Sequence, residues 1–466
     1  MSLVLQSVQL KEKSKKLHPE STFSSKTYMD LFDGAVWTTY TNQNSFNLEI
    51  ELCGNAEITL YAWAKKGERK ISSKTINHFK MRKTSFEFEV SEDEAVYFQL
   101  KAIDEVEISH IQYSLDSVDD LNKINLSVII CTYKRKQQVM ANIERLKSSL
   151  FFEPTSEYYQ KIHIYVVDNA SELQKKDEAY CKVFHNPNTG GSGGFTRGIV
   201  ESRKDVEKNG TTHVVFMDDD VGFINETFYR LYALLSLVSK KYADNPVAGR
   251  MFRMDQRDIQ YTAAEIWNKG DLRHVGFNQD MRDKKNWLSM NKELGEYSGW
   301  WFACFPIEFV KVNLPLPFFI HCDDVEYGLR CGKSPLLLNG IQVWHETYES
   351  RQDATILYYD IRNTIITNVV RGLYATPKEV IKAFNLKVLY SLKARKFTSS
   401  YAMIVAFKDY LKGKTAFVEN QNKKTIVNHN VLVGLLLTVV MLPALQIENV
   451  IKGNKAFWSY KQLLEK

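Results

Sequence analysis

"NLSVIICTYKR", residues 125–135, is a nearly continuous apolar run that ends in polar residues. A strand with both faces buried in a parallel sheet has this composition, because neither face contacts water. Similar runs follow at residues 161–171 ("KIHIYVVDNAS") and 213–223 ("HVVFMDDDVGF"), and helical stretches separate the three. Strands that alternate with helices predict an α/β fold on a parallel sheet, with ligands bound at the carboxyl ends of the strands.

The preceding part of the chain has a different pattern. Five short runs of alternating apolar and polar residues lie at 46–52, 57–64, 85–90, 95–102 and 106–114. The turn-forming segments "CGN", "KKGE" and "SEDE" stand between some of these runs. Such alternation predicts consecutive antiparallel strands. We therefore expect residues 1–122 to form an N-terminal β-sandwich domain.

The C-terminal part, residues 358–466, has a helical and basic pattern. Residues 376–466 contain 15 Lys and Arg against 5 Asp and Glu, a surplus of +10, although the whole chain carries only +6. Such a surplus favours contact with an anionic surface. The most apolar stretch, residues 431–447, is shorter than the roughly 20 residues that span a bilayer, and Pro443 interrupts it. It predicts a buried or membrane-surface helix.

The composition, with 44% hydrophobic and 25% charged residues, is that of a folded globular protein. The six cysteines are scattered without a CxxC pair, which argues against a disulfide framework, a redox motif or a zinc ribbon. The first residues lack the order of a secretory signal. No nucleic-acid-binding motif is present, and the basic surplus lies away from aromatic residues that would stack bases. We expect a cytoplasmic protein that does not bind nucleic acid.

Three acidic residues, Asp218, Asp219 and Asp220, end the third predicted strand. Side chains alternate along a strand, so Asp218 and Asp220 share a face and Asp219 does not. Two carboxylates on one face suit a hard divalent cation, which prefers oxygen ligands and can hold a diphosphate. His345, after another short predicted strand, offers a third ligand. The alternatives are an acidic loop cap for the aspartates and a structural role for His345.

Polar residues also follow the first two predicted strands. Arg135 suits a phosphate or a base, and Thr132 offers a hydroxyl, although an arginine that begins a helix is commonly solvated. Asp168 can accept the imide N–H of a uracil, and it can equally cap a helix. These residues are candidates for nucleotide contact.

The segment "NPNTGGSGGFTRG", residues 186–198, has four glycines in five positions before a helix. It includes Asn188 and Gly193 and permits close backbone approach of a phosphate or a sugar. Its spacing fits neither the ATP-binding phosphate loop nor the dinucleotide fingerprint, so ATP hydrolysis and NAD chemistry are disfavoured.

Two later motifs suit sugar chemistry. Trp300 and Trp301 can stack on sugar rings, although buried aromatic residues more often belong to a core. Asp323, Asp324 and Glu326 follow an apolar segment, where one carboxylate can act as a general base and its neighbours can orient the acceptor. The alternative is that these acids only favour the start of a helix.

The order of these motifs resembles the inverting family 2 glycosyltransferases with a GT-A fold, and among them the galactofuranosyltransferases that extend bacterial cell-surface galactan. This resemblance implies a GT-A (Rossmann-like) catalytic domain at residues 123–357. It also implies that Asp218, Asp220 and His345 hold Mn²⁺ or Mg²⁺ against the UDP diphosphate, and that Asp324 is the catalytic base. The other implied contacts are to the nucleotide (Thr132, Arg135, Asp168, Asn188, Gly193, Asp219) and to the sugar or acceptor (Trp300, Trp301, Asp323, Glu326).

The function implied by the resemblance is transfer of galactofuranose from UDP-galactofuranose to a lipid-linked glycan, in cell-wall or O-antigen polysaccharide synthesis. The implied location is peripheral, on an anionic membrane surface at the cytoplasmic face. The alternatives are a rhamnosyltransferase or another hexosyltransferase of the same fold, and a non-catalytic carbohydrate-binding protein. The chain is shorter than the polymerising members of the family, so processivity and a homo-oligomeric state stay open.

Overall fold

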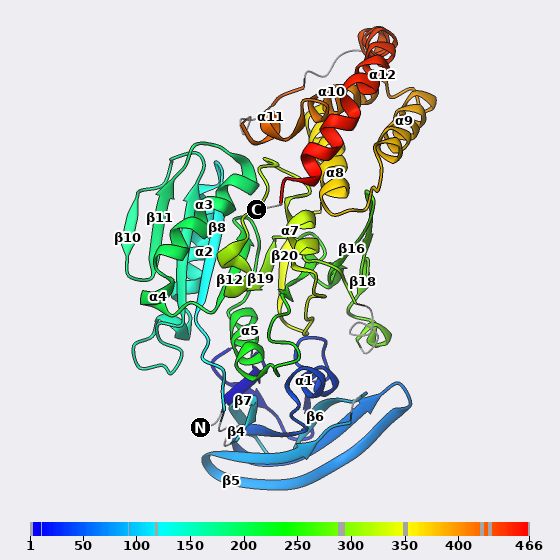
Figure 1. Cartoon of the computed structure of the whole chain (residues 1–466). Helices are drawn as coiled ribbons and strands as arrows, with labels where there is room; N and C mark the ends of the chain where they lie inside the picture. Colours follow the sequence, from blue (N-terminus) through cyan, green and yellow to red (C-terminus); the bar gives the residue numbers. More distant parts are fainter. Residues whose placement is uncertain are drawn as a thin grey trace.

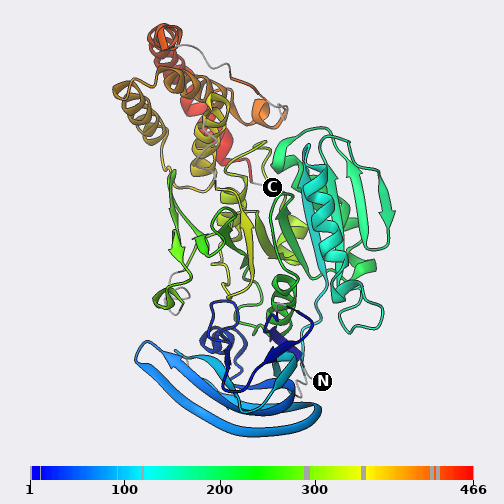
Figure 2. The ribbon, with the colours of Figure 1, turned by 180° about the vertical axis from the view of Figure 1, so that it is seen from behind.

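The computed structural model describes residues 3–10, 12–91, 93–116, 120–287, 294–347, 353–419, 424–426 and 431–464. Three parts follow one another along the molecule (Figure 1). A curved antiparallel sheet lies at one end, a mixed α/β part in the middle and a group of helices at the other end. The view from behind shows the same arrangement (Figure 2).

The middle part is built on a seven-stranded sheet with the strand order β10-β11-β9-β8-β12-β19-β13. Its strands are β8 (Leu126–Thr132), β9 (Ile162–Asp168), β10 (Lys176–Glu178), β11 (Cys181–His185), β12 (His213–Asp218), β13 (Val247–Ala248) and β19 (Phe302–Pro306). β11, β9, β8 and β12 run parallel, whereas β19 is antiparallel to β12. Helices α2 (Lys136–Lys147), α3 (Gly190–Lys204) and α4 (Val206–Asn209) stand between these strands in the chain. The predicted α/β fold with three buried parallel strands is confirmed.

The register of this sheet brings the polar ends of three strands together. Cys131 of β8 lies opposite Asp218 of β12, and Thr132 lies opposite Asp168 of β9. The strand interiors are buried, as their apolar sequences require. The candidate residues after each strand therefore gather at one edge of the sheet.

A smaller sheet brings His345 to the same edge. Its order is β18-β15-β14-β20, with β14 (Arg250–Arg253), β15 (Ile259–Thr262), β18 (Gln279–Asp280) and β20 (Gln342–His345). Backbone hydrogen bonds in both directions between Gly222 and Trp344, each 2.7 Å, tie β20 to the segment after the three aspartates. The hairpin β16 (Glu265–Asn268) and β17 (Asp271–His274), with α5 (Glu226–Leu237), α6 (Ile307–Val312) and α7 (Asp323–Cys331), completes this part.

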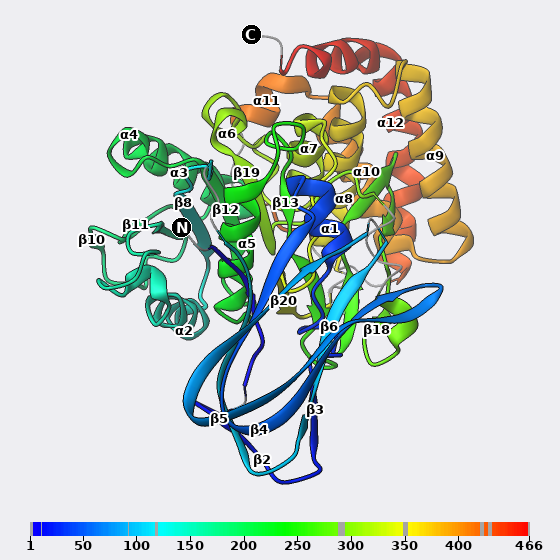
Figure 3. The same cartoon turned by 90° about the horizontal axis from the view of Figure 1, so that it is seen from below.

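The N-terminal part is one antiparallel sheet of seven strands. They are β1 (Leu3–Ser7), β2 (Lys15–Leu17), β3 (Thr22–Ser24), β4 (Ser45–Ala64), β5 (Gly67–Glu89), β6 (Ala95–Ala102) and β7 (Val106–Leu115), with α1 (Gly34–Thr41) between β3 and β4. β4 and β5 form a long curved hairpin (Figure 3), and β4 pairs with β7 along its first half and with β6 along its second. All seven strands are hydrogen-bonded into a single sheet. A β-sandwich requires two sheets packed face to face, so that part of the expectation stays a prediction.

One predicted turn in this part is wrong. "CGN" lies inside β4, where the pairing register shifts between Leu52 and Gly54. Gly54 has φ +116°, and a Cβ there would lie 2.3 Å from the carbonyl oxygen of Glu105. The glycine thus bends the strand without ending it, because a β-bulge accommodates the irregular residue.

The C-terminal part consists of α8 (Ala354–Val370), α9 (Pro377–Lys393), α10 (Phe397–Tyr410), α11 (Gly413–Glu419) and α12 (Val431–Lys461). α8 begins four residues before the predicted boundary at residue 358. α12 passes through Pro443 and continues beyond Ile447, so the apolar stretch belongs to a longer helix that Pro443 does not interrupt, and a buried or membrane-surface position stays a prediction. By length and composition, Leu432–Lys461 is able to cross a membrane, and only 17% of its most apolar window is buried. Its buried residues pack against the rest of this helical part.

Candidate active site

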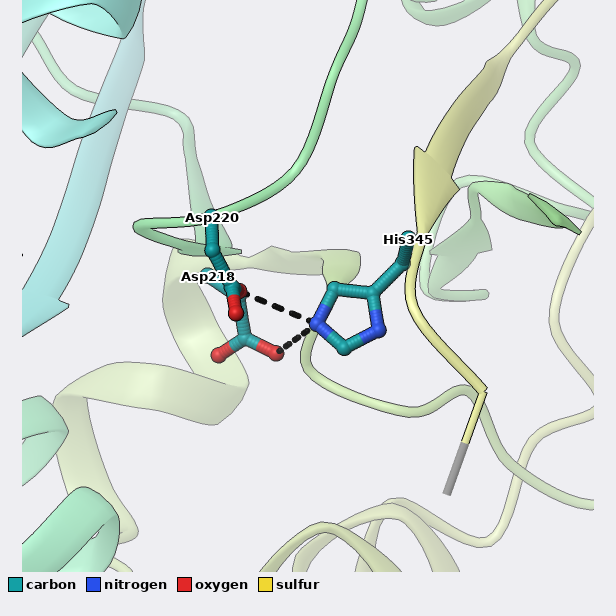
Figure 4. Close-up of side chains that lie close together, drawn as sticks. All are labelled: Asp218, Asp220 and His345. Carbon is teal, nitrogen blue, oxygen red and sulfur yellow. Dashed lines mark hydrogen bonds and ion pairs between the residues drawn. The ribbon is translucent and has the colours of Figure 1, made fainter. Parts of the chain in front are cut away.

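The ends of β12 and β20 bring Asp218, Asp220 and His345 together (Figure 4). The His345 Nε2 atom lies 3.0 Å from Asp220 Oδ1 and 3.8 Å from Asp218 Oδ2. One potential ligand atom from each of the three residues lies within 4.8 Å of the others. The sequence spans 127 positions between the first and the last of these residues, and β20 closes that separation by pairing with β14.

The donor set of this cluster fits Mn²⁺ or Mg²⁺, which bind carboxylate oxygens and accept an imidazole nitrogen. His345 Nδ1–H donates to the carbonyl oxygen of Glu346 at 2.7 Å, which leaves Nε2 as the nitrogen facing the two aspartates. Burial, together with the smaller effect of the neighbouring Asp220, raises the pKa of Asp218 to about 7. A divalent cation would offset the cost of ionising these buried carboxylates.

Asp219 is not a member of this cluster, and with Asp220 it stands in the turn after β12, so strand alternation does not extend to either residue. Asp219 Oδ1 accepts a hydrogen bond of 2.9 Å from Arg135, which also lies 3.0 Å from Asp220 Oδ2. The amide of Asn142 on α2 donates to the carbonyl oxygens of Asp219 and Val221, both at 3.0 Å. Arg135 therefore offsets part of the acidic charge, and Asn142, which the sequence analysis missed, holds the turn that carries it.

A cavity of about 300 Å³ lies beside this cluster. Four of the predicted nucleotide-contacting residues line it, namely Thr132, Arg135, Asn188 and Asp219. Asp168 does not line it, because its two carboxylate oxygens accept hydrogen bonds from the amides of Ala170 at 2.9 Å and Leu173 at 2.7 Å. Asn169, the next residue, lines the cavity instead. Within the described residues no helix begins directly after Asp168, so the structure does not show the helix cap that was its alternative either, and its carboxylate caps the amides of its own loop.

The four glycines of residues 190–194 lie in the first turns of α3, and only residues 186–189 of the glycine-rich segment precede the helix. Gly190 has φ +71°, and a Cβ there would lie 2.0 Å from the carbonyl oxygen of Phe319. A Cβ on Gly194 would lie 2.1 Å from the sulfur of Cys131. Gly193 does not line the cavity, and its missing side chain leaves room for Thr189. The glycines therefore allow α3 to pack closely on β8 and on the segment before α7.

A second cavity of about 650 Å³ shares Asp218 with the first. Four residues predicted to act on the sugar or the acceptor line this cavity, namely Trp300, Trp301, Asp323 and Asp324. Both tryptophans are only 5% exposed. Trp301 donates its indole N–H to the carbonyl oxygen of Gly249 at 2.8 Å. Both rings therefore belong to the hydrophobic core, which was their alternative, and they leave only a small surface for a ligand.

Helix α7 presents its first two acids to this cavity. Burial and the adjacent Asp323 raise the pKa of Asp324 to about 8. Asp323 accepts a hydrogen bond of 2.9 Å from the hydroxyl of Ser192. Glu326 lies on another side of the helix, fully buried, and accepts a 2.7 Å hydrogen bond from Arg330. The structure does not bring Glu326 to the cavity, because its carboxylate turns to Arg330 and stands two positions from Asp324, a spacing at which helix side chains do not face each other.

The segment before α7 is strained and held from α8. Phe319, His321 and Cys322 all have positive φ, which costs free energy for residues with a side chain. Asn363, buried on α8, donates to the carbonyl oxygens of Phe318 at 3.2 Å, of Ile320 at 2.7 Å and of His321 at 2.9 Å. Sequence patterns gave no sign of Asn363, because its role depends on a contact between distant parts of the chain.

Comparison with known proteins supports a glycosyltransferase. The model of the family "Glycosyl transferase family 2" matches residues 127–296. The galactofuranosyltransferase GlfT2 of Mycolicibacterium smegmatis is 23% identical over 76% of this chain and 58% of its own length. GlfT2 of Mycobacterium tuberculosis is 22% identical over 76% of this chain and 59% of its own length. The chain therefore spans less than two thirds of these relatives.

Solved structures add nothing to this comparison. A glycosylation-associated protein complex (Gap123) from Streptococcus agalactiae is 9% identical and covers 50% of this chain and 74% of its own. Its TM-score is 0.16, which is too low to support a common fold.

Proposed function

We infer the function from one premise: the chain is a family 2 galactofuranosyltransferase-like protein, and residues 127–296 carry its glycosyltransferase family 2 domain. We propose that it is an inverting, metal-dependent glycosyltransferase that moves galactofuranose from UDP-galactofuranose to a glycan acceptor. One observation carries this proposal. Asp218, a member of the Asp218–Asp220–His345 cluster, lines both cavities, and Asp324 lines the larger of the two.

In the proposed reaction, Asp324 removes the proton of an acceptor hydroxyl inside the larger cavity. The acceptor oxygen attacks the anomeric carbon from the face opposite UDP, and the bond from that carbon to UDP breaks with its electron pair. Arg135 and the edge of the smaller cavity orient the nucleotide. A divalent cation held by Asp218, Asp220 and His345 would supply positive charge that stabilises the leaving diphosphate.

A panel of nucleotide sugars tests the donor. We expect metal-dependent transfer from UDP-galactofuranose to exceed transfer from UDP-galactopyranose and dTDP-rhamnose by at least tenfold, measured as product formed on a galactofuranosyl acceptor. A preference for dTDP-rhamnose would indicate a rhamnosyltransferase of the same fold. Binding of glycans without transfer from any donor would indicate a carbohydrate-binding protein.

The acceptor in this proposal is lipid-linked, and the helical part lies against the cytoplasmic face of an anionic membrane. Support comes from an apolar ridge on one side of α12, defined as the exposed apolar residues Leu432, Leu436, Val439, Val440, Ile447, Val450, Ile451 and Trp458. The opposite side of α12 packs against α10 and α11. Exposed lysines on α9, including Lys378, Lys382 and Lys393, add positive charge to the same part. A helix with an apolar face and nearby cations suits an anionic membrane surface.

Removing apolar side chains from this ridge tests the membrane contact. The double variant Leu436→Glu with Val450→Glu should reduce binding to vesicles that contain phosphatidylglycerol about tenfold or more, because each side chain contributes roughly 1.5–3 kcal/mol when it is buried. Phe79→Glu is the matched control, because Phe79 is 91% exposed on the N-terminal sheet. Unchanged sedimentation with vesicles would refute the contact. A concentration-dependent oligomer that the double variant abolishes would assign the ridge to a second copy of the chain.

A further inference from the structure

The larger cavity extends away from the aspartate cluster along α8. Asp360 of α8 lines it and pairs with His321 at 2.7 Å, close to the predicted base. Thr364 lies one helical turn, about 6 Å, further along the same wall. There it meets Gly270 in the β16–β17 turn, because a Cβ on Gly270 would lie 2.9 Å from Thr364 Cγ2. The cavity therefore has a far end formed by α8 and the β16–β17 turn.

Lys387 of α9 stands at this far end. A Cβ on Gly270 would lie 3.2 Å from its Nζ, so the ammonium group lies against the β16–β17 turn. Lys387 is half-buried between Phe384 and Val388, whose side chains belong to the core of the helical part. Lys382, on the same helix, is exposed. Lys387 thus occupies a packed position that lysines on α9 otherwise avoid.

The charge of Lys387 has no partner within the part of the chain that the structure describes. The other basic side chains that line the cavity are paired, His321 with Asp360 at 2.7 Å and His274 with Glu265 at 2.8 Å. Keeping a partly buried ammonium without a counterion costs solvation free energy. A bound anion would offset that cost.

We propose that Lys387 binds a phosphate group of the acceptor, so that this cavity selects phosphate-bearing glycans. The inference rests on the proposed function, because it takes the larger cavity as the acceptor site. A lysine ammonium is a compact charge with three donors that suits phosphate oxygens, whereas recognition of a planar carboxylate favours arginine. The hydroxyls of the acceptor sugar lie nearer the base, where the carboxylates of Glu265 and Asp360 accept hydrogen bonds.

Three acceptors test the inference. They share one galactofuranosyl disaccharide and carry an alkyl phosphodiester, a neutral alkyl group or an alkyl carboxylate. Lys387→Met, which keeps most of the side-chain length, should lower kcat/KM for the phosphodiester acceptor about tenfold, mainly through KM, because a hydrogen bond to a charged group is lost. The kcat/KM of Lys387→Met for the neutral acceptor and its KM for the donor should match those of the wild type. Lys382→Met, the control on the exposed side of α9, should retain the wild-type preference.

Several outcomes would overturn the inference. They are a wild-type protein without preference for the phosphodiester, an equal loss on the neutral acceptor in Lys387→Met, and equal use of the carboxylate acceptor. If the wild type transfers no sugar, the proposed function fails, and calorimetric binding of the phosphodiester disaccharide still decides the role of Lys387. Weaker binding by Lys387→Met but not by Lys382→Met would support it, and equal binding by both variants would refute it.

Discussion

Replacing Asp324 by asparagine should lower kcat about 10²- to 10⁴-fold, the usual contribution of a general base, while UDP binding stays at the wild-type level. Asparagine keeps the size of the side chain and an oxygen that can accept the 2.8 Å hydrogen bond from the Val325 amide. It removes only the ability to take a proton. Steady-state transfer assays and calorimetry with UDP measure the two quantities separately.

The pH dependence of the wild type offers an independent readout of the same residue. Because the pKa of Asp324 is raised to about 8, the fraction of ionised base and with it kcat/KM should rise with pH up to about 8. The folded pKa exceeds the unfolded value of about 3.9, so the folded state loses stability as the pH rises through about 8. Asp324→Asn should therefore unfold at no lower temperature than the wild type at pH 8, and its residual activity should not follow this pH profile.

Glu326→Gln is the comparison that separates the base from its neighbours. Glu326 stands two residues further along α7, but it pairs with Arg330 away from the cavity. The folded Glu326→Gln protein should retain kcat within about threefold and lose thermal stability, since one partner of a buried pair is neutralised. A large kcat loss in Glu326→Gln together with normal turnover in Asp324→Asn would reverse the two roles.

The sequence predicted the middle part of the fold well, because burial on two faces requires continuous apolar strands such as residues 126–132 and 213–218. The position of polar residues at the strand ends also follows from that pattern, and the register of β8, β9 and β12 confirms it. The sequence analysis placed the four glycines of residues 190–194 before a helix, but they lie in the first turns of α3 although glycine has a low helix propensity. Tight packing of α3 on Cys131 and on the carbonyl oxygen of Phe319 overrides this propensity.

Long-range contacts account for the parts that sequence patterns do not reveal. Asp168 satisfies two backbone amides of its own loop, a choice that depends on the loop conformation. Asn363 and Lys387 stand on helices of the C-terminal part, yet they contact the segment before α7 and the cavity beside it. Their positions follow from how α8 and α9 pack on the middle part, and no local motif encodes that packing.

Removing one ligand of the aspartate–histidine cluster should abolish metal-dependent donor binding. We expect Asp220→Asn and His345→Gln each to weaken UDP binding in the presence of Mn²⁺ at least about hundredfold, since losing a direct ligand exceeds the 10–100-fold effect of altering a supporting group. UDP binding without metal should change little, because Arg135 and the edge of the smaller cavity remain. Calorimetry with UDP in Mn²⁺ and in a chelator measures this difference.

The control for this prediction is an acid close to the cluster but outside it. Asp255 follows β14, the partner strand of β20, and its carboxylate is exposed and paired with Arg253 at 3.0 Å. Asp255→Asn should keep the full response to Mn²⁺. If Asp220→Asn and His345→Gln kept it as well, the three residues would not form the metal site. The charge of the three consecutive aspartates would then be offset by Arg135 and His345 alone, which lie 3.0 Å from opposite oxygens of Asp220.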